Sequence, residues 1–152
     1  ARHRRGAMTA ALSRLERGVD YDIRDATPLG DEVAFILDGW RWSSLRADAT
    51  RGVPREVHFS EMTPRILAAL RRCRVKVAFD MKDEATILGW AVLEGTALHY
   101  VLVRRDFRRQ GIARQLLSGE RIEFYSAKPA EFRGAPAAWK YNPWAFVPIE
   151  RG

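Results

Sequence analysis

The sequence predicts a single α/β domain with a mixed β-sheet, in the element order β-α-α-β-β-β-α-β-(α)-β. Two early segments carry apolar residues at helix spacing. Three later strand candidates are joined by turns so short that only antiparallel neighbours fit, which predicts a meander. A helix separates this meander from the next strand candidate, and such a connection favours a parallel crossover.

The first strand and the first helix are expected before residue 46. Residues 19–26 alternate polar and apolar side chains in the manner of a strand. Thr27 and Pro28 are typical of a helix start, since Thr can cap and Pro fits the first helical position. Helix-spaced apolar residues then extend the helix to Leu45.

The polar segment 46–59 is expected to be a loop, because it holds a glycine and a proline among charged residues. A second helix is then expected to start at Ser60 or at Thr63–Pro64. The side chains expected on its buried stripe are Met62, Ile66, Leu67, Leu70 and Cys73.

The three meander strands are expected at 75–80, 86–94 and 97–103. The last of them leads through a basic turn into a helix over 110–118. A strand at 121–126 follows that helix, and we expect it to lie parallel to the last meander strand.

The end of the chain is expected to be less regular. Residues 128–138 contain two prolines and a glycine, so any helix there is short. A last strand over 144–149 is expected at a sheet edge, because Pro143 precedes it, Pro148 lies within it, and proline cannot donate to a ladder.

Composition limits the class of protein. The single cysteine, Cys73, excludes an intrachain disulfide framework, argues against a cysteine-based zinc site and is typical of a reducing compartment, so we expect a cytoplasmic protein. We expect no membrane partner, because no apolar run approaches the ~20 residues of a membrane span. Residues 1–8 are expected to be a flexible basic arm or a cloning remnant, and residues 9–152 one domain.

The formal charge is +7, with 22 arginines and only 4 lysines. Three of the arginines lie in the first five residues, and without them the formal charge falls to +4. Such a balance permits a nucleic-acid partner or an anionic ligand and does not choose between them.

The segment 97–117 is the most informative stretch. An apolar strand passes through an arginine- and glycine-bearing loop into a helix. Free backbone N–H groups and the helix dipole at such a junction suit a ligand that contains phosphate.

In this loop Arg108, Gly111 and Ala113 fill a pattern of Arg or Gln, two residues, Gly, one residue, and Gly or Ala. With the element order above, the chain resembles the GNAT superfamily of N-acetyltransferases, as a compact single-domain member similar to short phage-encoded chains. The resemblance implies a GNAT-like fold and an acyl-CoA-dependent N-acyltransferase. The expected cofactor is acetyl-CoA or another acyl-CoA.

The resemblance also assigns the residues that would hold the cofactor. The strand end would pair with the pantetheine arm through its backbone, and the loop would bind the diphosphate. Gly111 lacks a Cβ, which would let the phosphates approach the backbone. The residues assigned in this way are Leu102, Val103, Arg104, Arg108, Arg109, Gln110, Gly111, Ile112 and Ala113.

Direct attack of an amine on the thioester needs a base and benefits from an acid. His99 has a side-chain pKa near neutrality and is the first candidate base, with Glu94 as the second. The family's acid is often a tyrosine near the end of the fold, which implies Tyr141, with Tyr125 as the alternative. His99 and the two tyrosines could instead serve only in packing, and Glu94 could be a turn carboxylate in water.

The acceptor is expected to be an amine-bearing molecule that the sequence does not identify. The residues Trp40, Arg41, Trp42, Arg46, Arg51 and Arg55 could form a basic, aromatic surface on its side. Because of that surface, a second alternative is a protein that binds or modifies nucleic acid on a GNAT-like scaffold. A third alternative is a catalytically degenerate GNAT fold. No metal site is expected, because His3, His58 and His99 lack ligand-like spacing.

Overall fold

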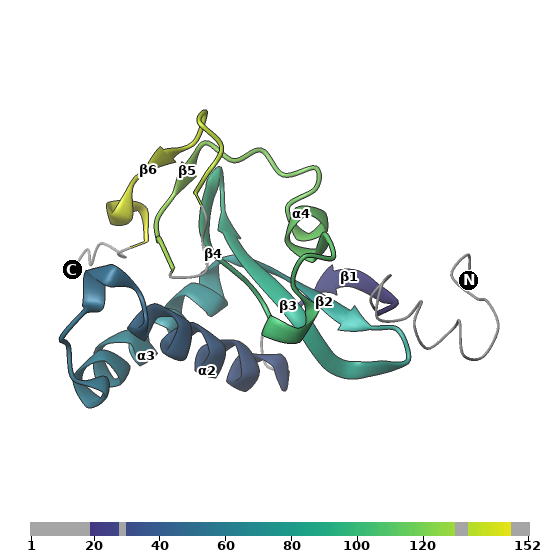
Figure 1. The fold of residues 1–152 in the computed structure, drawn as a ribbon, viewed down its shortest axis with the longest axis horizontal. Helices are drawn as coiled ribbons and strands as arrows, with labels where there is room; N and C mark the ends of the chain where they lie inside the picture. Colours follow the sequence, from purple (N-terminus) through teal and green to yellow (C-terminus); the bar gives the residue numbers. More distant parts are fainter. Residues whose placement is uncertain (1–18, 28–29, 130–133, 147–152) are drawn as a thin grey trace.

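The computed structural model describes residues 19–27, 30–129 and 134–146 (Figure 1). The expected arm at 1–8 lies outside these ranges. The strands are β1 (Tyr21–Asp25), β2 (Arg74–Asp80), β3 (Asp83–Glu94), β4 (Ala97–Val103), β5 (Phe124–Tyr125) and β6 (Lys140–Tyr141). The helices are α2 (Glu32–Leu45), α3 (Arg55–Arg72) and α4 (Ile112–Leu116), with single 3-10 turns η1 (Asp48–Thr50), η2 (Arg105–Phe107) and η3 (Pro143–Ala145).

The six strands form one mixed sheet in sequence order. β1 to β4 pair antiparallel, as the short turns between β2, β3 and β4 require. β5 then pairs parallel with β4, and β6 pairs parallel with β5. The predicted fold class, a mixed sheet with an antiparallel meander followed by a parallel crossover, is confirmed.

Helices cover both faces of this sheet (Figure 1). The α2 and α3 helices pack on one face through Ile36, Trp40 and Ile66. The short α4 packs on the other face through Ile112 and Leu116. The central strands are therefore buried on both sides, which explains the nearly continuous apolar run of β3.

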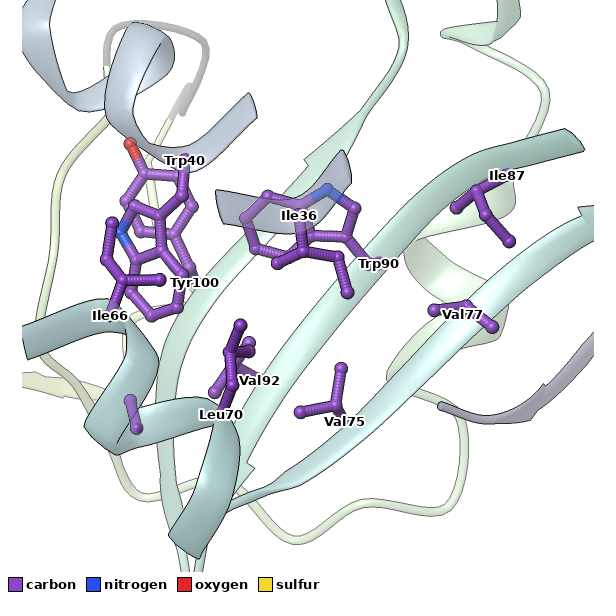
Figure 2. Close-up of a cluster of buried hydrophobic side chains, with 11 residues drawn as sticks. Ile36, Trp40, Ile66, Leu70, Val75, Val77, Ile87, Trp90, Val92 and Tyr100 are labelled. Atoms are coloured by element: carbon purple, nitrogen blue, oxygen red, sulfur yellow. The ribbon is translucent and has the colours of Figure 1, made fainter. Parts of the chain in front are cut away.

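The α2/α3 face has an aromatic centre, which Figure 2 shows among aliphatic side chains. Trp40 is 2% exposed and lies 5.6 Å from the ring of Trp90 and 5.0 Å from that of Tyr100. Ser43 Oγ lies 2.9 Å from the hydroxyl of Tyr100, so the polar end of this cluster is also satisfied. Trp40 is thus a core residue and not part of an acceptor surface.

A β-bulge at His99 divides β4 into two parts. Leu93 pairs with Leu98 and Val92 with Tyr100, so His99 is an extra residue opposite β3. Because of this extra residue, side chains two positions apart across the bulge point to opposite faces of the sheet. Leu98 packs on the α4 face, whereas Tyr100 packs on the α2/α3 face.

The predicted helix boundaries in the first half are wrong at two places. The α2 helix starts at Glu32 and not at Thr27, because Gly30 N donates to Thr27 O in a turn before the helix. The α3 helix starts at Arg55, inside the segment expected to be a loop. Pro54 provides its N-cap, and Pro64 lies in the helix interior instead of at its start.

The C-terminal expectations also need correction. The α4 helix covers only five of the nine expected residues. No helix occurs in the described part of 128–138, and the last strand is β6 instead of 144–149. Pro143 starts a 3-10 turn, and the side chain of Asn142 accepts from Trp144 N. Of the expected strand, residues 147–149 lie outside the described ranges. No helix in the described part of the chain is long and apolar enough to span a membrane.

Candidate functional site

A groove opens where β4 continues beyond its parallel partner β5. The two strands pair only at Ala97 and Leu98 of β4, and Ser126 N still donates to Leu98 O at 3.1 Å. β4 then runs on to Val103 without β5 beside it. Since Arg104 N donates to Leu88 O, the alternation of the strand directs the backbone groups of Val103 away from β3 and toward the groove.

This groove has a volume of about 1010 Å³. One wall is the end of β4, Val101–Val103. A second wall is formed by the following loop and α4, with residues 107–109, 111–115 and 117–118. The third comes from the C-terminal part, through Pro129, Pro136 and Trp139. The groove therefore extends from an unpaired strand edge to a basic loop.

The loop between η2 and α4 has an unusual backbone. Arg109 has φ 64° and Gly111 has φ 81°, so two of the three residues 109–111 have a left-handed backbone conformation. Such a change of hand turns backbone N–H groups toward a shared concavity that suits anions. No hydrogen bond among the described residues uses the N–H of Gly111.

Three arginines give the loop end of the groove its positive charge: Arg108, Arg109 and Arg114. Arg108 is fixed, because its Nε donates to the carbonyl oxygen of Val103 at 2.8 Å. The predicted contribution of a helix dipole is smaller than expected, because α4 has only five residues. Charge in this groove comes mainly from guanidinium groups.

Most of the residues assigned to the cofactor line the groove, and two do not. Arg104 Nη1 donates to Ile87 O at 3.4 Å, and its guanidinium lies over the rings of Phe35 and Phe107. The Gln110 side chain accepts from Val19 N at 3.2 Å. Sequence reasoning missed Arg114 and Leu117, which helix spacing could have found, and Trp139, for which the sequence gives no signal.

His99 is buried away from the groove lining. Its side chain is fully covered, with Nε2 2.7 Å from Glu94 Oε1 and Nδ1 2.8 Å from Ser126 Oγ. Because an ionised carboxylate can only accept, Nε2 carries the proton and Nδ1 accepts from the Ser126 hydroxyl. Burial lowers the pKa of His99, and the Glu94 hydrogen bond opposes this shift. Its role as a base stays a prediction.

Glu94 connects His99 to two further residues. Its Oε2 accepts from Arg72 Nε at 3.1 Å, and its Oε1 lies 3.8 Å from Cys73 Sγ. Burial acts to raise the pKa of Glu94, but the hydrogen bonds from His99 and Arg72 outweigh it and lower the pKa. Burial, together with the Glu94 carboxylate, raises the pKa of the Cys73 thiol to about 12, so the thiol is protonated at neutral pH.

The two candidate acids lie side by side. Tyr125 of β5 pairs with Tyr141 of β6, and their ring centroids are 5.3 Å apart. Tyr125 is also 6.4 Å from the ring of Trp139, which lines the groove. Tyr141 is 43% exposed and carries Lys128 Nζ 4.3 Å above its ring. Neither tyrosine lines the groove, but Tyr125 contacts Trp139, which does.

Several arginines expected on the acceptor side have acidic partners. Arg41 pairs with Asp38, Arg51 with Asp48, and Arg55 with Glu56. Arg41 lies over the ring of Phe59, and Arg55 over that of Trp42. Trp42 and Phe59 give this surface its aromatic rings, and much of its charge is locally neutralised. A nucleic-acid partner stays a prediction.

Comparison with known proteins gives matches among solved structures. No protein-family model matches the sequence, and no curated protein matches it. The chain is similar to the apo form of YjaB from Escherichia coli, with 18% identity over 65% of this chain and 63% of that chain and a TM-score of 0.49. It is also similar to YncA from Salmonella typhimurium, which was solved with its cofactor acetyl-CoA (20% identity, 64% and 59% covered, TM-score 0.41).

A third similar structure is an acetyltransferase of the GNAT family from Staphylococcus aureus Mu50, with 15% identity, 64% and 61% covered and a TM-score of 0.40. The match spans less than two thirds of each of these three proteins. At these identities and TM-scores the likeness assigns neither a family nor an activity to this chain. A relation to phage proteins stays a prediction.

Proposed function

We propose that the chain is an acyl-CoA-dependent N-acyltransferase that binds acetyl-CoA, or another acyl-CoA, in the groove beside β4. One observation carries the proposal. A single groove of about 1010 Å³ joins an unpaired strand edge to a loop with three arginines. An acyl-CoA has the matching chemistry, because a diamide arm connects its thioester to a diphosphate.

Each part of the groove has a partner in such a ligand. The backbone at Val101–Val103 would pair with the amides of the pantetheine arm in the manner of an added strand. Arg108, Arg109 and Arg114 would neutralise the phosphates with charge-assisted hydrogen bonds. The remaining wall, which includes Trp139, is apolar and would cover the arm.

In the proposed reaction the neutral amine attacks the thioester carbonyl. The new C–N bond forms, the C–S bond breaks, and the thiolate leaves with a proton. The nitrogen loses its proton to a base, for which His99 with Glu94 is the candidate. Tyr125 is the better placed candidate acid for the departing thiolate, and Tyr141 is the alternative.

Two measurements test the proposal. Calorimetric titration of the full chain with acetyl-CoA should show binding in the micromolar range, and no binding at high micromolar concentration would refute it. A panel of primary amines with acetyl-CoA should then release free CoA thiol. Binding without release from any amine would support the degenerate fold instead.

The nucleic-acid alternative predicts a different result. A protein that contacts several phosphates loses affinity steeply as salt rises. A gel-shift series over salt concentration should therefore show strong binding at low salt if nucleic acid is the partner. Absent or salt-insensitive binding would argue against it.

A further inference from the structure

Three side chains of different elements meet on the α3 side of the β4 bulge. Cys73 follows the last residue of α3, Glu94 ends β3, and His99 is the bulge residue of β4. The Cys73 Sγ, one Glu94 carboxylate oxygen and one His99 ring nitrogen all lie within 4.8 Å of one another. We propose that these three residues bind a zinc ion or a similar divalent transition metal.

The donor set fits such a metal. Zinc binds thiolate sulfur, imidazole nitrogen and carboxylate oxygen, and sites with three protein ligands keep the fourth position for water or another ligand. A thiolate and a carboxylate together also balance the charge of a divalent cation. Magnesium and calcium prefer all-oxygen sites, so the set favours a transition metal.

Two of the three ligand–ligand distances are close to those of a tetrahedral site. With the usual zinc–ligand bond lengths, neighbouring sulfur and oxygen or nitrogen ligands lie about 3.5 Å apart, and nitrogen and oxygen ligands about 3.3 Å. Cys73 Sγ is 3.8 Å and His99 Nε2 is 2.7 Å from Glu94 Oε1. Shifts of about half an ångström would bring both pairs to these separations.

Groups around the three ligands hold them in suitable orientations. Ser126 Oγ contacts Nδ1 of His99, and in the metal-bound form Nδ1 would carry the proton and donate to Ser126 Oγ, which would leave the Nε2 lone pair for the metal. Arg72 Nε holds Oε2 of Glu94, so the carboxylate would bind through Oε1 alone. On metal binding the proton of Cys73 Sγ would leave to solvent and the proton of His99 would move from Nε2 to Nδ1, so one proton would be released per metal ion.

A metal could reach the cluster from solvent, because the Glu94 side chain is 41% exposed. The proposed binding of acyl-CoA does not depend on this site, since none of the three residues lines the groove. A metal bound to His99 Nε2 and Glu94 would, however, exclude this pair as the base of the proposed reaction. From the sequence, the presence of a single cysteine argued against a zinc site built from several cysteines. A mixed site with one cysteine was not visible there, because its members come from three elements.

Cobalt(II) titration of the reduced full chain tests the proposal. A thiolate bound to cobalt gives an intense ultraviolet charge-transfer band, and Cys73 is the only cysteine in the sequence. We expect this band at one equivalent of cobalt, and we expect zinc to remove it by displacement. Absence of the band in the folded wild-type protein at millimolar cobalt would overturn the proposal, without reliance on any variant.

Variants then identify the other ligands. Cys73→Ser should abolish the band, and His99→Gln should weaken cobalt binding more than a hundredfold. Ser126→Ala, which removes only the contact to Nδ1, should weaken it about 10–100-fold. His3→Ala should leave it unchanged, and unchanged binding in His99→Gln would exclude His99 as a ligand. Cys73→Ser should still bind acetyl-CoA as the wild type does, which separates this inference from the acyl-CoA proposal.

Discussion

Arg108 Nε donates a 2.8 Å hydrogen bond to the carbonyl oxygen of Val103, which lies five residues earlier at the end of β4. This contact fastens the basic loop to the strand that it leaves. It uses one of the five N–H donors of the guanidinium. The others remain for a ligand in the groove that Arg108 lines.

Arg108→Ala should therefore weaken acetyl-CoA binding about 10–100-fold, because a hydrogen bond to a charged group contributes about 1.5–3 kcal/mol. Arg105→Ala removes the same charge from an exposed position outside the groove and serves as the matched control. Calorimetry on both variants checks this. Equal losses would mean that only net charge matters and would contradict a specific role for Arg108.

Gly111→Ala should lower stability by about 1 kcal/mol, because φ is +81° and the left-handed region costs an L-residue about 1–2 kcal/mol. The added Cβ meets no protein atom within 4 Å, so strain is the expected cost. Gly52→Ala is a matched control, with φ +86° and equally open space. Urea denaturation should show similar losses for both, whereas only Gly111→Ala should weaken acetyl-CoA binding.

Tyr125→Phe should lower kcat by about a hundredfold or more if this hydroxyl protonates the leaving thiolate, since general acid–base groups contribute about 10²–10⁴. Tyr141→Phe is the matched variant in the neighbouring strand and should change kcat little. Steady-state assay of CoA release checks both. The reverse order would move the role of acid to Tyr141.

Glu120 joins the segment after α4 to β2. Its carboxylate accepts from Arg74 at 2.9 and 2.6 Å and from Lys76 at 3.1 Å. The hydrogen bonds from Arg74 are the largest cause that lowers the pKa of Glu120, from its usual 4.5 to about 2. A lowered pKa adds stability above pH 4.5, and that stability is lost as the pH falls toward 2.

Glu120→Gln should therefore lower the free energy of unfolding at pH 7 by about 1–2 kcal/mol, a value reduced by the solvent exposure of Arg74. Urea denaturation from pH 7 to pH 2 should show the difference from wild type shrinking to near zero. Glu123→Gln, which breaks an exposed pair with Arg121, should cost less than about 0.5 kcal/mol. A difference for Glu120→Gln that does not depend on pH would contradict an ionic contribution.

The central sheet could be predicted from the sequence because its signals are local. The β4 bounds agree at both ends, and short turns alone require the meander. The start of α3 could not be predicted, since its first turns at 55–61 hold only two apolar residues, Val57 and Phe59, and bury only His58. Apolar periodicity is absent there, and tertiary packing decides the structure.

The candidate site was predictable in part for the same reason. Loop residues such as Arg108 and Gly111 form a contiguous motif, so the sequence indicates them directly. The contact between Glu94 and His99 depends on a bulge, and the place of Trp139 depends on how the C-terminal segment packs. Neither has a local signal in the sequence.

The bulge at His99 makes this position an insertion in an otherwise regular strand. Leu98 and Tyr100 already lie on opposite faces, so deletion of His99 would leave them as consecutive residues with ordinary alternation, opposite Leu93 and Val92. Tyr100 would stay beside Trp40, and Val103 would stay in the α4 layer. A chain without His99 should therefore keep its sheet and lose the contacts of this side chain with Glu94 and Ser126.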